Sequence, residues 1–158
     1  VFAEKSEVWY ETTENYSSEM FLISEEITSE DGYKIISRTY SSVNPKIRGV
    51  SGRGIFKHEK ELVYINHTLK YWVQGYFTWN QDKDTATVSN VDKGFSSVNG
   101  VTVSNEKLDY KSNQGATSWF GNKYAYARYS FTATNPVGLT RTADIYIDVN
   151  VKGEFVSR

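Results

Sequence analysis

The sequence of 158 residues contains no cysteine, only two prolines and two histidines, and no long apolar run. Without cysteine there is no disulfide framework, no thiolate nucleophile and no cysteine ligand for a metal. The low proline content and 39% hydrophobic residues argue against a disordered or collagen-like chain. The longest purely apolar run, Met20–Ile23, is far shorter than the roughly 18 residues of a membrane-spanning helix. These absences leave a soluble, globular protein.

The residues that are present favour β-structure. There are 12 tyrosines, 8 phenylalanines and 4 tryptophans, together 15% of the chain, along with many threonines, serines and valines. Such side chains fit a pleated, half-buried sheet surface, whereas leucine, alanine and methionine, which favour helices, are scarce. Because aromatic rings bury large areas, a β fold with few leucines can still form a stable core.

The clearest periodicity lies near the C-terminus. Residues 124–134 alternate apolar with polar or tyrosine side chains, and residues 139–152 do the same with one interruption at Arg141. The connecting Asn-Pro-Val-Gly at 135–138 has the residues typical of a turn. A period of two over this length predicts two antiparallel strands, each with one face in water, joined as a long hairpin.

A second alternating segment covers residues 69–79 and returns, after a polar turn, through residues 85–91 with Ala86 and Val88 facing inward. Gly75 interrupts the first of these segments, where a bulge or a close approach of another group to the backbone is expected. We therefore predict a second hairpin here.

Two dipeptides are strong hairpin signals. Asp31-Gly32 lies between the strand-like segments 20–29 and 33–41, and Asn99-Gly100 lies between two valines. A short helix is the alternative for residues 16–27, because two consecutive glutamates break the alternation there.

These patterns together predict an all-β fold with little helix: an antiparallel β-sandwich, with a barrel as the runner-up. We expect a single β domain over residues 1–158. Within it, residues 1–60 form an acidic N-terminal hairpin region plus a basic loop, and residues 61–158 form a C-terminal β module. The least regular stretch, 42–60, separates the two.

Charge is unevenly distributed although the net charge is only −1. Residues 1–31 contain nine acids and one lysine, a net of −8, so the remainder carries +7. Five cations form a basic patch after residue 45: Lys46, Arg48, Arg53, Lys57 and Lys60. We favour its pairing with the acidic N-terminus over an anionic partner, because the overall charge and motifs argue against nucleic acid. The glycines at 49–54 lack the flanking strand, helix and lysine of a phosphate cradle and are interpreted as a loop or hinge.

No motif for catalysis or metal binding is complete, so we expect no catalytic residues, no metal and no cofactor. His58-Glu59 opens like a zinc-protease helix, but Leu62 occupies the position of the second histidine. Asp82, Asp84 and Asp92 invite a calcium site, yet the loop pattern that calcium requires is missing. Paired carboxylates for sugar hydrolysis stay open, because sequence does not show their spacing in space.

Aromatic residues are the most informative candidates for binding. Five of them fall on strand faces opposite the apolar ones: Trp72, Tyr76, Tyr124, Tyr126 and Tyr146. Exposed rings on a sheet can stack on sugars or contact a protein. The alternative is that a second layer covers them and they belong to the core. Trp119, in a predicted loop, is a separate candidate.

The order of features over residues 69–155 resembles the small secreted all-β domains of unknown function from Gram-positive bacteria. The matching features are the strand and turn at 75–80, the polar middle and the final hairpin ending in Lys152-Gly153. The resemblance implies a secreted β-sandwich and supplies no activity or site residues. The small residues at the start, Val1-Phe2-Ala3, fit the end of a secretory signal peptide.

We therefore predict a secreted, extracellular, non-enzymatic β-sandwich that recognises a cell-surface glycan or protein and does not bind nucleic acid. The alternative is a bacteriocin-like or membrane-active effector, the one case in which membrane contact is expected. A glycan-acting enzyme is the third possibility.

Overall fold

The computed structural model describes residues 4–9, 17–30, 32–43, 49–65, 68–97, 100–117 and 120–158. These residues form strands and turns and contain no helix. The ten strands are β1 (Glu4–Trp9), β2 (Ser17–Glu30), β3 (Tyr33–Ser41), β4 (Ser51–Val63), β5 (Thr68–Asn80), β6 (Thr85–Ser97), β7 (Thr102–Gln114), β8 (Tyr124–Thr134), β9 (Thr140–Asn150) and β10 (Phe155–Ser157).

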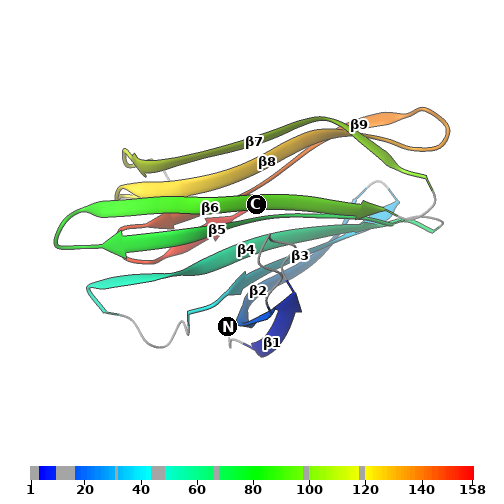
Figure 1. Cartoon of the computed structure of the whole chain (residues 1–158). Helices are drawn as coiled ribbons and strands as arrows, with labels where there is room; N and C mark the ends of the chain where they lie inside the picture. Colours follow the sequence, from blue (N-terminus) through cyan, green and yellow to red (C-terminus); the bar gives the residue numbers. More distant parts are fainter. Residues whose placement is uncertain are drawn as a thin grey trace.

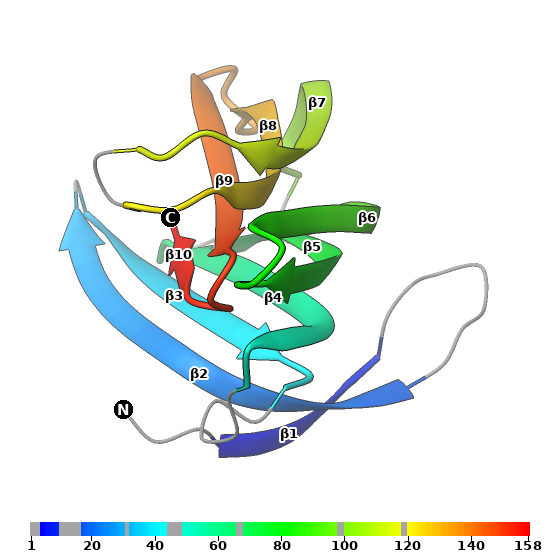
Figure 2. The same cartoon turned by 90° about the vertical axis from the view of Figure 1, so that its left-hand side faces the viewer.

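The strands form two antiparallel sheets (Figure 1). The first sheet has the order β1-β2-β3-β4-β5-β6, and the second has the order β10-β9-β8-β7. Figure 2 shows the second sheet stacked on the first, with β1 at the edge farthest from it. Because the two sheets remain separate ladders, the predicted all-β sandwich is confirmed and the barrel is wrong.

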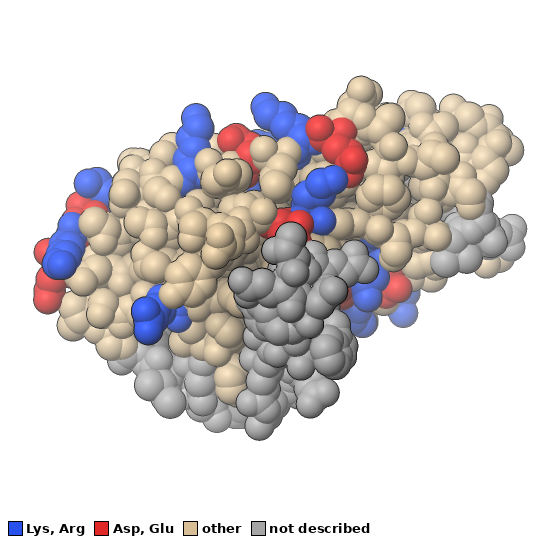
Figure 3. Space-filling view, viewed as in Figure 1, with Lys and Arg blue, Asp and Glu red and all other residues tan. Residues whose placement is uncertain are grey.

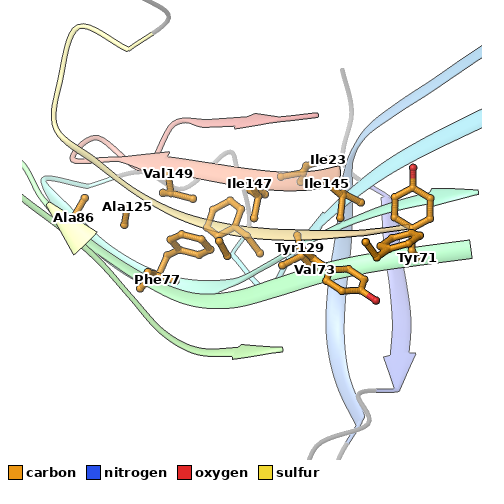
Figure 4. Close-up of a cluster of buried hydrophobic side chains, with 14 of the residues drawn as sticks. Ile23, Tyr71, Val73, Phe77, Ala86, Ala125, Tyr129, Ile145, Ile147 and Val149 are labelled. Carbon is orange, nitrogen blue, oxygen red and sulfur yellow. The ribbon is translucent and has the colours of Figure 1, made fainter. Parts of the chain in front are cut away.

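The core between the sheets follows from the alternation of side chains. Tyr71, Val73 and Phe77 of β5 are buried, and they face Tyr129 and the other inward residues of β8 and β9 (Figure 4). Aromatic contacts between the sheets stabilise this core. The ring centroids of Tyr71 and Phe131 are 4.9 Å apart, and the two ring planes are nearly perpendicular. The predicted inward face of residues 69–79 is confirmed.

Two of the predicted turns and the bulge expected at Gly75 are confirmed. Thr134 pairs with Thr140 in the β8–β9 hairpin, and Asn135 Oδ1 accepts hydrogen bonds from two amides of that turn. Glu30 pairs with Tyr33 across the two residues at 31–32, so β2 is a strand and the short helix is wrong. The β5–β6 register shifts opposite Gly75, where a Cβ would lie 2.8 Å from a Val88 methyl group.

The stretch expected to be irregular contains β4. Four consecutive residues of this strand are buried: Phe56, Lys57, His58 and Glu59. Because both faces of the strand are covered and three of these residues are polar, its sequence shows no alternation of apolar and polar side chains. Gly52 belongs to this strand and not to a loop: a Cβ there would lie 2.5 Å from the Trp79 ring. The expected boundary at residues 60–61 falls inside β4, and residues from both parts share one core.

The second dipeptide signal is wrong as a hairpin. The segments on either side of Asn99-Gly100 are β6 and β7, which belong to different sheets. The backbone at Gly100 does have φ of +81°, the left-handed conformation that glycine favours. In the described part of the chain no helix is long and apolar enough to cross a membrane.

Candidate functional site

A groove on the outer face of the second sheet brings together three of the candidate aromatic residues. Tyr124 and Tyr126 lie two residues apart on β8, and Tyr146 lies on the neighbouring strand β9, directly opposite Arg128. All three rings are half-buried. The groove has a volume of about 490 Å³, and its other lining residues are Gln114, Arg128, Asp144 and Asp148. This size is in the range of small-ligand sites.

The rings form a continuous aromatic surface along β8. The centroids of Tyr124 and Tyr126 are 6.4 Å apart with an interplanar angle of 36°, and Phe120 extends the series with its centroid 5.8 Å from that of Tyr124. The strand repeat places Tyr124 and Tyr126 on the same side of the sheet, while Ala125 between them is fully buried in the core.

Polar groups surround these rings and fix their orientation. The Tyr126 hydroxyl donates a hydrogen bond of 3.0 Å to Asp109 Oδ2. Arg128 Nη2 lies 2.7 Å from Asp144 Oδ2, and the Arg128 guanidinium carbon is 5.9 Å from the centre of the Tyr146 ring. Both partners of the ion pair are about half exposed, so it contributes little to stability and its groups remain accessible.

The tyrosines in the groove stay protonated at neutral pH. Burial raises the pKa of Tyr124, and nearby Asp148 adds to the effect. Burial likewise raises the pKa of Tyr126 and of Tyr146, and the hydrogen bond to Asp109 raises that of Tyr126 further. The phenols of Tyr124 and Tyr146 can therefore donate to a ligand and accept from it, whereas Tyr126, whose hydrogen is donated to Asp109, can only accept.

The remaining aromatic candidates lie elsewhere. Trp72 and Tyr76 are half-buried on the outer face of the first sheet, four residues apart on β5. The Trp72 ring covers Gly94 of β6, and Lys57 Nζ lies 4.9 Å from its centre. Trp119 lies outside the described residues. The five candidates that the structure describes thus lie on two outer faces, because the two sheets of the sandwich turn their solvent-exposed sides in opposite directions.

The described members of the basic patch do not form one exposed surface. Lys46 and Arg48 lie outside the described residues. Arg53 is exposed, but Lys57 is only 7% exposed, and its Nζ lies 3.9 Å from Glu59. Lys60 sits on the opposite face of β4 with its Nζ 3.5 Å from the Asp144 carbonyl oxygen, and burial lowers its pKa. Strand alternation separates residues that are close in sequence.

The acidic N-terminus was the expected partner of that patch. The side chains of residues 4–19 are outside the described set, so pairing with them stays a prediction. Glu25 of β2 does form an ion pair, with Arg38 at 2.8 Å. Arg38 also approaches Glu59 at 3.7 Å, and Lys70 approaches Glu59 at 3.5 Å. The sequence did not predict this cluster of the buried Glu59 carboxylate and three cations, because its residues come together only when β3, β4 and β5 pair.

The structure separates the other residues considered for chemistry. Asp84 pairs with Lys123 at 3.3 Å, and Asp92 accepts a hydrogen bond from the Lys93 amide. Among the described residues no group of three or more histidines and acids is placed to hold a metal. His58 is buried between the sheets, and His67 lies outside the described residues.

Four residues of the groove were not among the candidates: Gln114, Arg128, Asp144 and Asp148. Three of them share the alternating positions that singled out the tyrosines on β8 and β9, so the same periodicity carries the signal. Gln114 comes from β7, whose register to β8 shifts just before it, between Lys111 and Gln114. No family model, curated protein or solved structure matches the chain.

Proposed function

We propose that this protein is a non-enzymatic, extracellular recognition module that binds an uncharged glycan on a cell surface through the groove of Tyr124, Tyr126 and Tyr146. The observation that carries the proposal is the juxtaposition of these three half-buried rings with hydrogen-bonding side chains in one groove. A sugar ring has an apolar C–H face and a rim of hydroxyl groups, so it requires both kinds of contact.

The rings supply the apolar part. Tyrosine presents a large, rigid surface with few rotatable bonds, and little conformational entropy is lost when a ligand covers it. The two rings on β8 follow the strand, which suits an extended chain of sugars lying along the sheet. A half-buried ring is already held in place before the ligand arrives.

The polar residues supply the hydroxyl contacts and argue for a ligand without negative charge. Asp144 and Asp148 accept hydrogen bonds, Arg128 donates them, and Gln114 does both. With Asp109 beside Tyr126, carboxylates outnumber the guanidinium at this surface. An anionic polymer would meet repulsion here, whereas neutral hydroxyls fit acceptors and donors of both kinds.

The arrangement of the two groove carboxylates supports binding without hydrolysis. Asp144 and Asp148 are four residues apart on one strand, which places their Cα atoms about 13 Å apart. Glycosidases bring their two carboxyl groups to within about 5–9.5 Å. The Asp144 carboxylate is also already engaged, since it accepts a hydrogen bond of 2.7 Å from Arg128 Nη2.

Binding to a panel of neutral polysaccharides, measured by glycan array and then by calorimetry, tests the proposal. We expect Tyr124→Ala and Tyr146→Ala each to weaken binding by about tenfold or more, since each removes a stacking surface worth roughly 1.4 kcal/mol. Tyr110→Ala is the matched control: Tyr110 is a more exposed tyrosine on β7 outside the groove, and its loss should leave binding unchanged.

Each alternative gives a different result. Binding abolished by Trp72→Ala and insensitive to Tyr124→Ala would move the site to the first sheet. Leakage of liposomes without any glycan binding would favour the membrane-active alternative, and capture of a protein ligand by the groove would replace the glycan. Thermal unfolding of each variant, monitored by circular dichroism, separates loss of the site from loss of the fold.

A further inference from the structure

A second cavity, of about 460 Å³, opens at the end of the sandwich that contains the β8–β9 turn, and it shares no residue with the tyrosine groove. Both sheets contribute to it. Its apolar wall consists of Leu62 and Leu69 at the β4–β5 turn, Val101 before β7, and Ala133 at the end of β8. The three larger side chains of this wall are buried, so the wall is part of the main core.

Two polar groups in this lining are available to a ligand: a buried hydroxyl without a partner and an exposed guanidinium. The Tyr33 side chain is only 4% exposed, and its hydroxyl has no hydrogen-bond partner in the described structure. An unsatisfied buried hydroxyl is costly, and native proteins rarely contain one without a reason. Arg141 lies at the surface with its guanidinium carbon 4.5 Å from the centre of the Tyr33 ring. Within the described ranges Arg141 forms no ion pair.

We propose that this cavity binds a small apolar monocarboxylate, such as a medium-chain fatty acid. The apolar chain lies against Leu62, Leu69 and Val101, and the carboxylate accepts hydrogen bonds from the Tyr33 hydroxyl and the Arg141 guanidinium. The ligand thereby gives the Tyr33 hydroxyl a hydrogen-bond partner and the Arg141 guanidinium a counter-ion, and neither group has one among the described residues.

The chemistry of the donors selects this class of ligand. An uncharged lipid would leave the guanidinium without a counter-ion, and a phosphate with nearly two charges would find a single cation among the lining residues. A carboxylate matches the charge of one arginine, and the planar guanidinium is suited to its two oxygens. Stacking on Tyr33 holds the guanidinium in place and leaves its edge free to donate.

The surroundings of the cavity suit an aliphatic chain. Val137 and Leu139 in the β8–β9 turn are 80% and 69% exposed, and Leu139 lines the cavity itself. Figure 3, in the same view as Figure 1, shows described atoms without Lys, Arg, Asp or Glu at this right-hand end. A chain longer than the cavity would therefore continue over the exposed side chains of Val137 and Leu139.

Calorimetric titration of the full chain with sodium decanoate, kept below its micelle concentration, tests the proposal. We expect saturable binding of one equivalent. Arg141→Gln should weaken it by about tenfold or more, because a hydrogen-bonded ionic contact is lost. Arg53→Gln, which removes an exposed arginine outside the cavity, is the matched control and should leave binding unchanged. Decanol, with the same chain and no charge, should bind more weakly and respond little to Arg141→Gln.

Tyr33→Phe gives a second, independent measurement. It removes only the hydroxyl, so decanoate binding should weaken several-fold, while the midpoint of thermal unfolding without ligand should rise because an unsatisfied buried group is gone. A merely structural tyrosine would not produce this opposite pair of effects. Non-saturable binding, equal binding by wild type and Arg141→Gln, or a dimer that forms through this end and excludes decanoate would each overturn the proposal.

Discussion

At the scale of single residues, His58 is the clearest case of a titratable group whose protonation is opposed by the fold. Its ring is buried between the sheets, and Nδ1 lies 3.0 Å from the Arg38 carbonyl oxygen and 2.9 Å from Thr39 Oγ1. A carbonyl only accepts, so Nδ1 carries the proton of the neutral ring. Nε2 is buried with no partner in the described structure, and a second proton there would have no acceptor.

Protein stability should therefore depend on the charge of His58. Burial lowers its pKa from 6.5 to about 4, and the charge of Lys60 adds to this effect. Above pH 6.5 both the folded and unfolded states hold a neutral ring. Between pH 6.5 and 4 only the unfolded state gains the proton, so the free energy of unfolding falls as the pH falls. The total contribution is about 3 kcal/mol, lost across this window and constant below it.

Urea denaturation at a series of pH values, for wild type and His58→Gln, measures that contribution. The variant should lack the part of the pH dependence between pH 6.5 and 4 that is due to this imidazole, while the carboxylates contribute equally to both proteins. An NMR titration showing an imidazole pKa near 6.5 for His58 would contradict the expectation directly, whatever the variant does to overall stability.

At the scale of elements, glycine and tryptophan on neighbouring strands of the first sheet act as a pair. Trp72 of β5 is directly opposite Gly94 of β6, and its ring occupies the space that a side chain at position 94 would need. A Cβ on Gly94 would lie 2.6 Å from the Trp72 ring. The aromatic ring covers backbone that a glycine alone would leave exposed, and so keeps the outer face of the two strands packed.

Gly94→Ala should displace the Trp72 ring and destabilise the protein by about 1–3 kcal/mol, the usual cost of overpacking. Tryptophan emission should shift to longer wavelength because the ring becomes more exposed. Gly115→Ala is the control, since a Cβ at Gly115 has nothing within 4 Å. Equal stability and equal emission spectra for the two variants would show that the ring does not need the glycine.

The alternation of apolar and polar side chains along a strand explains which strands could be predicted from the sequence. Strands β8 and β9 have one face in the core and one in a groove, so their alternation was visible and it also placed Tyr124, Tyr126 and Tyr146 on the outer side. Strand β4 was missed because polar residues such as His58 and Glu59 are buried on both faces. The connection from β6 to β7 was wrongly predicted to be a hairpin. The Asn99-Gly100 dipeptide indicates a turn, but it does not indicate which sheet each flanking strand joins.

The cavity at the end of the sandwich could not be predicted in the same way. Its lining comes from five separate parts of the chain, around residues 33, 62–64, 69, 101 and 133–141. Tyr33 and Arg141 are more than a hundred positions apart, and neither belongs to a motif. Only the packing of one sheet on the other brings them together.

At the scale of the whole molecule, the fold mixes charges that the sequence keeps apart. Strand β2 belongs to the acidic part of the chain, but it pairs with β3, and Arg38 of β3 reaches Glu25, Glu59 and Glu61. On the face drawn in Figure 3, the described Lys and Arg are interspersed with Asp and Glu. On that face, the described charges of residues 20–158 therefore form no large field of one sign.

Side chains and not backbone ladders join the two sheets at their edges. At the β6–β7 edge, Glu106 accepts hydrogen bonds from Lys93 at 2.6 Å and from the Tyr129 hydroxyl. These contacts lower the pKa of Glu106, with the lysine as the larger cause. At the β10 edge, Ser157 Oγ is 2.8 Å from Thr39 Oγ1. These contacts link the edges of the two sheets, which otherwise meet through the shared hydrophobic core.

The last strand, β10, should therefore matter to stability far more than its three residues suggest. Phe155 faces inward, and its ring centroid is 6.1 Å from that of Phe56 on the other sheet. Val156, the next residue, faces outward by the alternation of the strand. Phe155→Ala should lower the free energy of unfolding by about 2 kcal/mol, less than for a fully buried phenylalanine because the ring is half-buried. Val156→Ala should cost less than half as much. Denaturant unfolding of both variants measures the difference, and equal costs would mean that β10 does not tie the second sheet to the first.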